Sequence, residues 1–202
     1  MLKTIISFAA ATLICCGCSK NSGAVAPNST AAQSSSSPAQ LQNAAGELRY
    51  KVPEGWVVEK STSSMRVAQY KLPKMAGDTD DGLLVLYYFG QGQGGTPQAN
   101  IDRWIDQMKQ PDGSSSKDKA KTETLTVNGL QVTTVDVLGN YSGGMGMAQG
   151  GPPQDSKAIY RLRAAIIDTP KGSYFVKLTG PEKTVGHWEQ AYGEYLKSFE
   201  FK

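Results

Sequence analysis

The sequence predicts an α+β domain, in which a mainly antiparallel β-sheet has a few helices packed on it. Two hairpin signals carry this prediction. Asn128-Gly129 lies between two stretches of β-type residues, and Pro170 and Gly172 lie in the turn between two more. Such turns join neighbouring antiparallel strands. In addition, only two stretches have the apolar spacing of an amphipathic helix, so strands outnumber helices.

The first part of the domain is predicted to consist of four strands. Residues 48–52 and 56–60 flank a Pro-Glu-Gly turn, and residues 65–72 alternate between apolar and polar side chains. Residues 83–89 (LLVLYYF) are apolar at every position. This pattern is typical of a central strand that is covered on both faces of its sheet.

One helix is predicted in the middle of the domain and one at its end. Thr96 is a favourable N-cap and Pro97 suits the first helical position, so a helix is expected from Pro97 to Lys109. A closing helix is expected from Pro181. Each has one apolar face, formed by Ile101, Trp104, Ile105 and Met108 in the first helix and by Val185, Trp188, Tyr192, Tyr195, Leu196 and Phe199 in the second. Between the helices, two hairpins are expected with strands at residues 122–127, 130–138, 158–168 and 174–179.

The N-terminus has the pattern of an export signal. Lys3 supplies a positive charge, and residues 4–14 form an uncharged, largely apolar run. This run is too short to cross a bilayer, which needs about 20 apolar residues. The sequence CCGC at residues 15–18 resembles the lipobox of bacterial lipoproteins, in which a small residue precedes a cysteine that receives diacylglycerol. The resemblance implies a signal peptide over residues 1–17 and lipidation of Cys18.

An alternative is a secreted protein without a lipid, cleaved at the A-x-A pattern of Ala24 and Ala26. That cleavage would leave Pro27 as the first mature residue, which signal peptidases disfavour. If the protein is a lipoprotein, its acyl chains anchor it stably to the membrane, because each methylene group buried in the bilayer contributes about 0.8 kcal/mol to the free energy of binding. We therefore expect an exported protein, anchored by lipid to a bacterial membrane and facing the periplasm or the cell surface.

The lipid attachment site and the folded domain are predicted to be separated by a tether. Residues 21–46 contain no charged residue and are rich in Ser, Ala and Gln. Such a composition does not offset the entropy lost on ordering, so residues 18–46 are predicted to be a disordered tether. Residues 47–202 are then a single α+β domain.

The start of this domain resembles a known fold family. The sequence VPEGW at residues 52–56, followed by strands, a central helix, hairpins and a closing helix, is similar to PsbP-like proteins over residues 48–202. The resemblance implies an α/β/α sandwich with a non-enzymatic binding, assembly or accessory role. It transfers no catalytic residue. Family members that bind metal use histidines, and His187 is the only histidine here.

Several classes of function are not expected. The net charge is +3, and the 21 basic residues are dispersed, so a nucleic-acid partner is not predicted. The three cysteines all precede residue 19, which excludes a disulfide or zinc scaffold in the domain. Residues 90–95 match the G-x-G-x-x-G pattern, but no second buried parallel strand follows the helix. We expect no nucleotide, no cofactor and no metal.

The predicted function is a lipid-anchored, non-catalytic binding or accessory module of the cell envelope, with a membrane and an envelope protein as its partners. Long Gly/Pro-rich loops are common contact surfaces. The residues expected to contact the partner are therefore Tyr141, Met145 and Met147, in and beside the loop at residues 142–154, and Gly92 and Gly94. Copper at the two methionines is not favoured, because no cysteine or histidine accompanies them.

A hydrolase acting on peptidoglycan or lipid is the alternative. Asp102 and Asp106 are four residues apart on the predicted helix, so they share a face and could act as acid and base. A deep pocket containing a carboxylate with a shifted pKa would favour the enzyme, whereas shallow loops would favour the binding module.

Overall fold

The computed structural model describes residues 48–61, 63–143 and 158–202. The predicted signal peptide, Cys18, the tether, Met145 and Met147 lie outside the described residues. In the part of the chain that is described, no helix is long and apolar enough to cross a bilayer.

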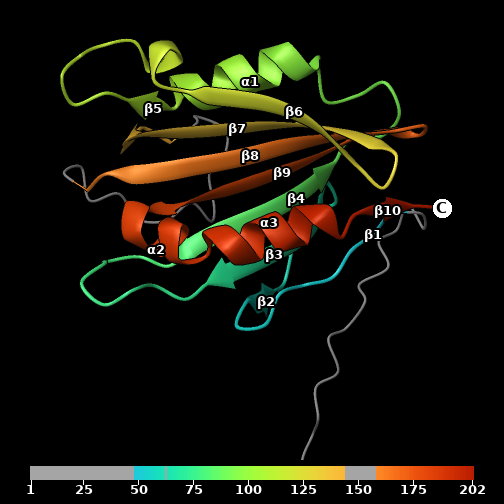
Figure 1. The fold of residues 1–202 in the computed structure, drawn as a ribbon, viewed down its shortest axis with the longest axis horizontal. Coiled ribbons are helices and arrows are strands. Elements are labelled where there is room, and N and C mark those ends of the chain that lie inside the picture. The colour runs from blue at the N-terminus through green and yellow to red at the C-terminus, as the bar shows by residue number, and fades with distance from the viewer. Residues whose placement is uncertain (1–47, 62, 144–157) are drawn as a thin grey trace, which may run out of the picture. The chain divides into compact units, whose positions relative to one another are not determined.

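The described residues form a predominantly antiparallel α+β domain (Figure 1). Strands β2, β3, β4, β9, β8, β7 and β5 lie side by side in that order, β6 pairs with β7, and neighbouring strands are antiparallel. The predicted fold class is confirmed. The elements in chain order are β1 (Leu48–Arg49), β2 (Val57–Glu59), β3 (Arg66–Leu72), β4 (Gly82–Tyr88), α1 (Pro97–Asp106), β5 (Met108–Lys109), the 3-10 helix η1 (Ser116–Asp118), β6 (Lys121–Val127), β7 (Leu130–Tyr141), β8 (Tyr160–Thr169), β9 (Gly172–Pro181), α2 (Glu182–His187), α3 (Glu189–Lys197) and β10 (Glu200–Phe201).

Both predicted hairpins are present. Asn128 and Gly129 have φ angles of 47° and 82°, which is the left-handed conformation that a tight turn between two antiparallel strands requires. Thr169 pairs with Gly172 at the end of the β8–β9 ladder. Because these turns are local, the strand pairs beside them follow directly from the sequence.

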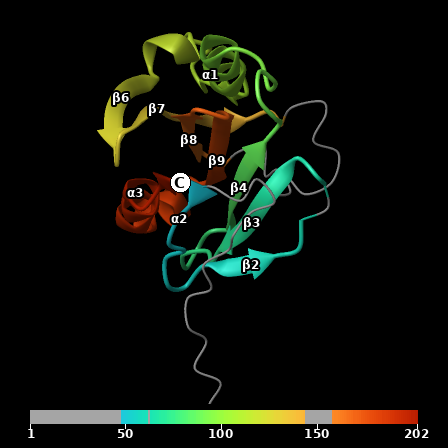
Figure 2. The same cartoon turned by 90° about the vertical axis from the view of Figure 1, so that its right-hand side faces the viewer.

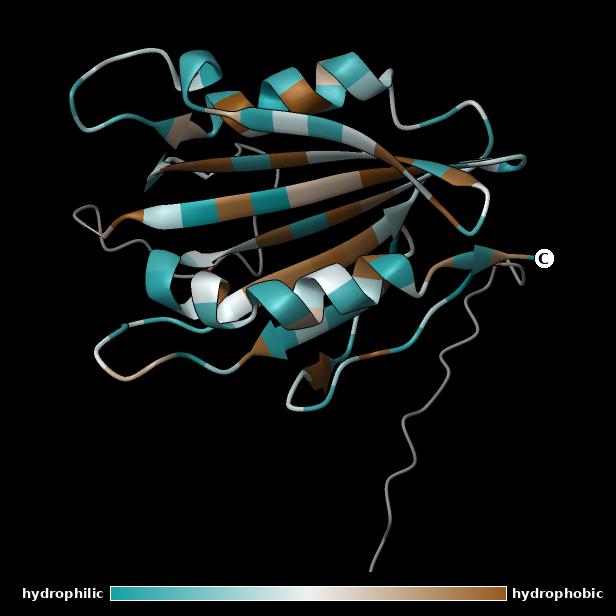
Figure 3. Ribbon diagram, in the orientation of Figure 1, coloured by the Kyte–Doolittle hydropathy of each residue, from teal (hydrophilic) through white to brown (hydrophobic). Residues whose placement is uncertain are grey.

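The helices cover the two faces of the sheet separately. Helix α1 lies over one face, and α2 and α3 lie over the other (Figures 1 and 2). The hydropathy colouring agrees, because α1 and α3 carry hydrophilic residues on their outward faces while the central strands are largely hydrophobic (Figure 3). The result is the expected sandwich, with one apolar core on each side of the sheet.

Strand β4 lies in the centre of the sheet, between β3 and β9. Leu84 and Leu86 belong to the core on the α3 side, whereas Val85 and Tyr87 belong to the core on the α1 side. All four side chains are buried. The prediction of a central strand covered on both faces is confirmed.

Helix α1 ends earlier than predicted. The helix was expected to continue to Lys109, but it stops at Asp106, and Met108 and Lys109 form β5 opposite Tyr141 and Asn140. The reason is the length of β7, whose pairing with β6 ends at Asp136. The residues of β7 beyond that point need another partner for their backbone groups, and β5 provides it. Met108 is buried as predicted, although on a strand.

The closing helix is interrupted rather than continuous, which corrects the single helix predicted from Pro181. Trp188 separates α2 from α3, and it is partly exposed rather than part of the buried face. Its indole N–H donates to the carbonyl oxygen of Pro73 at 3.0 Å. A Cβ placed on Gly55 would come within 2.7 Å of the ring. The Trp188 indole therefore contacts the β3–β4 loop and the β1–β2 turn. A continuous helix would not point the side chain toward these two segments.

The two ends of the domain also pair, which the sequence did not predict. Leu48 lies opposite Phe201, so β1 and β10 form a two-stranded ladder apart from the main sheet. Behind it, Trp56, Tyr195 and Phe199 are buried in one aromatic cluster, with the rings of Trp56 and Tyr195 5.1 Å apart. Aromatic pairs at this spacing stabilise the folded state by more than the burial of their apolar surface alone.

Candidate functional site

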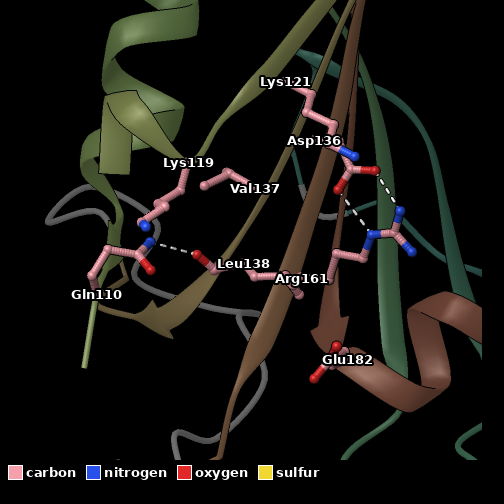
Figure 4. Close-up of a pocket in the computed structure, with 8 residues that line it drawn as sticks. All are labelled: Gln110, Lys119, Lys121, Asp136, Val137, Leu138, Arg161 and Glu182. Carbon is pink, nitrogen blue, oxygen red and sulfur yellow. Dashed lines mark hydrogen bonds and ion pairs between the residues drawn. The ribbon is translucent and has the colours of Figure 1, made fainter. Parts of the chain in front are cut away.

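A cavity of about 330 Å³ opens beside β7 and β8, between the residue that follows β5 and the start of α2 (Figure 4). Its wall combines an apolar surface with charged groups from several elements. The lining residues are Gln110, Lys119, Lys121, Asp136, Val137, Leu138, Arg161 and Glu182. Leu138 is 39% exposed, which is unusual for a leucine on a strand of a packed sheet and gives the cavity an apolar wall.

One wall of the cavity is built by the contact between β5 and β7. The side-chain amide of Gln110 donates to the carbonyl oxygen of Leu138 at 2.7 Å and to the Ser116 hydroxyl at 3.1 Å. Gly139 permits this approach, because a Cβ there would come within 2.8 Å of the carbonyl oxygen of Lys109. The unpredicted strand β5 therefore positions Gln110 at the cavity.

The floor of the cavity is a network of ion pairs. The Arg161 guanidinium donates to both carboxylate oxygens of Asp136, at 2.8 and 2.5 Å, and also contacts Glu189. Arg163 lies 3.4 Å from Asp136 and its guanidinium lies over the Tyr192 ring. The hydrogen bonds that Arg161 donates to Asp136, and then those that it donates to Glu189, raise the pKa of Arg161. Arg161 is thus a fixed cation in this cavity.

The rims of the cavity carry opposite charges. Lys119 and Lys121 are exposed on one side, and no ion pair among the described residues includes either of them. Glu182, the first residue of α2, lies on the other side (Figure 4). The lysine rim presents positive charge to an entering group, whereas the charge of Arg161 is balanced by Asp136 and Glu189. The arrangement is suited to holding an acidic group rather than to breaking a bond, because the carboxylate of Asp136 is already engaged by guanidinium groups.

The predicted contact residues lie in different places. Tyr141 lies at the end of β7, where its ring stacks on Tyr160 with centroids 6.2 Å apart. Gly92 and Gly94 lie in the β4–α1 loop, which contacts the β8–β9 turn at Gly172. That turn and Tyr160 are at opposite ends of β8, which are about 30 Å apart for a strand of this length. The structure therefore does not bring Tyr141 together with the two glycines.

Gly94 has a packing role in its loop. Its φ is +90°, and a Cβ there would come within 2.8 Å of Phe89 and 2.9 Å of Phe175. Gly92 also has a positive φ, of +70°, but it is exposed with nothing near its Cβ position. Of the two, only Gly92 lies where a partner could reach it without displacing packed side chains.

The carboxylates of the hydrolase alternative lie away from the cavity. Asp102 forms an ion pair with Lys117 at 3.3 Å, and Asp106 is exposed on α1. His187 is exposed beside Trp188, as its position on the helix predicted. No group of three metal-ligating side chains is found among the residues that the structure describes.

The cavity residues were not singled out by the sequence. One sequence pattern could have pointed to three of them. In strands β7 and β8, which are otherwise buried, charged residues alternate with apolar ones, and these charged residues are Asp136, Arg161 and Arg163. Lys119, Lys121 and Gln110 have no such signal. Gln110 reaches the cavity through the β5–β7 contact, and Lys121 reaches it through the pairing of β6 with Asp136 of β7.

A comparison with protein-family models finds no matching family, and a comparison with curated proteins finds no match either. Among solved structures, LpqN of Mycobacterium tuberculosis, described as involved in cell envelope biogenesis, is similar with a TM-score of 0.52 and 10% identity, over 77% of this chain and 83% of that chain. CyanoP, the PsbP of Synechocystis, is similar with a TM-score of 0.45 and 10% identity, over 77% of this chain and 86% of that one. The Ran-binding protein Mog1p of Saccharomyces cerevisiae has a TM-score of 0.47 and 10% identity, over 81% and 94%. The chain shares the fold of LpqN.

Proposed function

We propose that the chain is a lipid-anchored, non-catalytic module of the cell envelope that binds the acidic group of an envelope ligand or partner in the cavity between β5, β7, β8 and α2. The observation that carries this proposal is the charge arrangement of the cavity. Lys119 and Lys121 have no ion-pair partner among the described residues, while Arg161 beneath them is held by Asp136 and Glu189.

The exposed lysines supply long-range attraction, and the fixed guanidinium supplies orientation. An acidic group on the lysine rim would gain charge-assisted hydrogen bonds, and the exposed side chain of Leu138 would be covered by the apolar part of the same ligand. Because the cavity is partly open to solvent rather than closed, it is suited to a segment of a partner or a head group. It is less suited to a substrate that must be isolated from water.

The envelope location is supported by two observations of different kinds. The first is the N-terminal sequence, with its apolar run and Cys18. The second is the fold shared with LpqN, which is described as involved in cell envelope biogenesis. The predicted tether at residues 18–46 is consistent with a binding module held at the membrane. A flexible chain of this composition would let the domain reach partners near the membrane surface.

The test is a charge reversal at the lysine rim. Lys119→Glu/Lys121→Glu in the full-length lipoprotein should reduce the recovery of its bound partner from solubilised membranes by about tenfold or more, because attraction becomes repulsion. Lys51→Glu/Lys60→Glu is the matched control, since both lysines are exposed and lie outside the cavity. Both pairs should leave the free energy of unfolding within about 0.5 kcal/mol of wild type. Equal recovery with the two pairs would contradict binding in the cavity.

A further inference from the structure

Lys177 is a buried lysine in the middle of the sheet. It lies on β9 between Val85 of β4 and Ala164 of β8, on the side that α1 covers, and it is 5% exposed. Its ammonium donates to the side-chain oxygen of Gln107 and to the Tyr141 hydroxyl at 3.2 Å. The ammonium also lies 5.1 Å from the centroid of the Tyr141 ring.

Neither of these hydrogen-bond partners carries a negative charge that could balance the ammonium. No ion pair among the described residues includes Lys177. Lysines are rarely this buried without a carboxylate partner, because removing an ammonium from water is costly. Burial, and to a smaller extent the nearby Arg103, lower the pKa of Lys177 to about 8.

Arg103 of α1 adds a second cation to the same region. Its guanidinium donates to the side-chain oxygen of Asn100, which is neutral, and no ion pair of the described residues includes it. The carboxylate of the neighbouring Asp102 is paired with Lys117 instead. Among the described residues, neither the buried Lys177 nor the exposed Arg103 has a carboxylate partner, so the electrostatic potential at the Lys177 ammonium is positive.

Among the described residues, the tyrosines beside this volume carry no negative charge. Tyr87 of β4 and Tyr141 of β7 have raised pKa values because they are buried, so both stay neutral. Arg66 of β3 lies over the Tyr87 ring, 5.9 Å from its centroid. From β8, the residue opposite Lys177 is an alanine.

We propose that Lys177 and Arg103 form a binding site for the oxyanion of a small acidic ligand, a carboxylate or a phosphate group. The Lys177 ammonium and the Arg103 guanidinium would donate to the anion. The partly exposed Gln107 amide can reorient to donate to it as well. This site differs from the cavity of the proposed function, because Asp136 and Arg161 lie on the α3 side of the sheet and Lys177 on the α1 side.

The direct test follows the titration of the Lys177 ammonium in the wild-type domain by NMR of ¹³C-labelled lysine. Inorganic phosphate and acetate are added separately to a chloride buffer. A bound anion favours the charged amine, so the pKa of Lys177 should rise with a probe that binds. A rise in the pKa with phosphate alone indicates a phosphate site, and a rise with acetate alone indicates a carboxylate site. An unchanged titration with both probes would overturn the proposal.

Variants then test which residues bind the probe. Calorimetry should show binding weakened about ten- to hundredfold by Lys177→Met, and by a smaller factor by Arg103→Gln. The matched controls are Lys183→Met and Arg49→Gln, whose side chains are exposed and outside this cluster. Binding that is equal in Lys177→Met and Lys183→Met would overturn the assignment. If Lys177→Met does not fold, the wild-type titration still decides.

A further variant tests whether the counter-charge comes from the chain itself. Asp155 is the only acidic residue in the sequence between residues 144 and 157. If Asp155→Asn changes the titration of Lys177 with no probe present, the lysine already has an internal counter-ion, and the ligand site is refuted. An unchanged titration supports an external anion. None of these results bears on the lysine rim of the cavity, so the two proposals fail independently.

Discussion

The stability of the domain should depend on pH through Lys177, and Lys177→Met should remove that dependence. The side chain is 5% exposed, and burial lowers its pKa from 10.5 to about 8. Between these two values the folded domain has released the proton while the unfolded chain still binds it. The free energy of unfolding therefore rises with pH across this window, because the unfolded state binds more protons.

The size of the effect follows from the two pKa values. Between about pH 7 and about pH 9.5, the contribution of Lys177 to the free energy of unfolding should grow by about 2 kcal/mol. The window must end below about pH 10, because the buried Tyr70, Tyr192 and Tyr195 also have raised pKa values. Above that pH the unfolded tyrosines lose protons that the folded ones keep, so stability falls again.

Urea denaturation of wild type and Lys177→Met at several pH values measures this contribution. Methionine has a similar unbranched length and packs well in apolar surroundings, so the variant should fold. The lost hydrogen bonds to Gln107 and Tyr141 change with pH only as Lys177 itself titrates, so the difference in slope reports the titration of the Lys177 ammonium. The buffers should contain no phosphate or carboxylate, and Lys183→Met is the exposed control. A difference between the two proteins that stays constant within about 0.5 kcal/mol from pH 7 to 9.5 would show that Lys177 is not a desolvated cation.

Three further predictions concern the anchor, the core and the β4–α1 loop. Cys18→Ser should release the protein from the membrane fraction or leave an uncleaved precursor, as fractionation and mass spectrometry would show; membrane association with an unchanged lipid mass would contradict it. Trp104→Ala should lower the free energy of unfolding, measured by urea denaturation, by about 3–5 kcal/mol, because Trp104 is only 4% exposed. Trp188→Ala should lower it less, because that ring is partly exposed. Equal losses in the two variants would contradict this difference in burial. Gly94→Ala should lower the melting temperature, since a Cβ would come within 2.9 Å of Phe175 at a positive φ, while Gly92→Ala should lower it less; the reverse order would refute the packing role of Gly94.

The sequence by itself determined the parts of the fold that depend on neighbouring residues. Asn128-Gly129 and the turn before Gly172 fix two hairpins, because the conformation of a tight turn is set by the residues in it. The apolar run at residues 83–89 determined that β4 is central, because a strand that has no polar side chains must be shielded from water on both of its faces. Thr96 and Pro97 fixed the start of α1, where the Thr96 hydroxyl accepts from the amide of Ala99.

The ends of elements and the candidate sites were decided by contacts between distant parts of the chain. Strand β5 exists because β7 is longer than β6, and a helical stripe that includes Met108 contains no information about that length. Trp188 has the spacing of a core residue, but its contacts with Pro73 and Gly55 interrupt the helix. Such departures are expected where tertiary contacts outweigh local preference.

Lys177 illustrates the same division most clearly. Its strand was predicted, and alternation along that strand places Lys177 on the same face as Phe175 and Thr179. The sequence does not specify what lies over that face. Only the folded chain places α1 and the end of β7 around the ammonium, with Gln107 and Tyr141 as its neutral partners. A local pattern fixes the direction of a side chain, whereas its solvation and its counter-charge depend on segments that folding brings together.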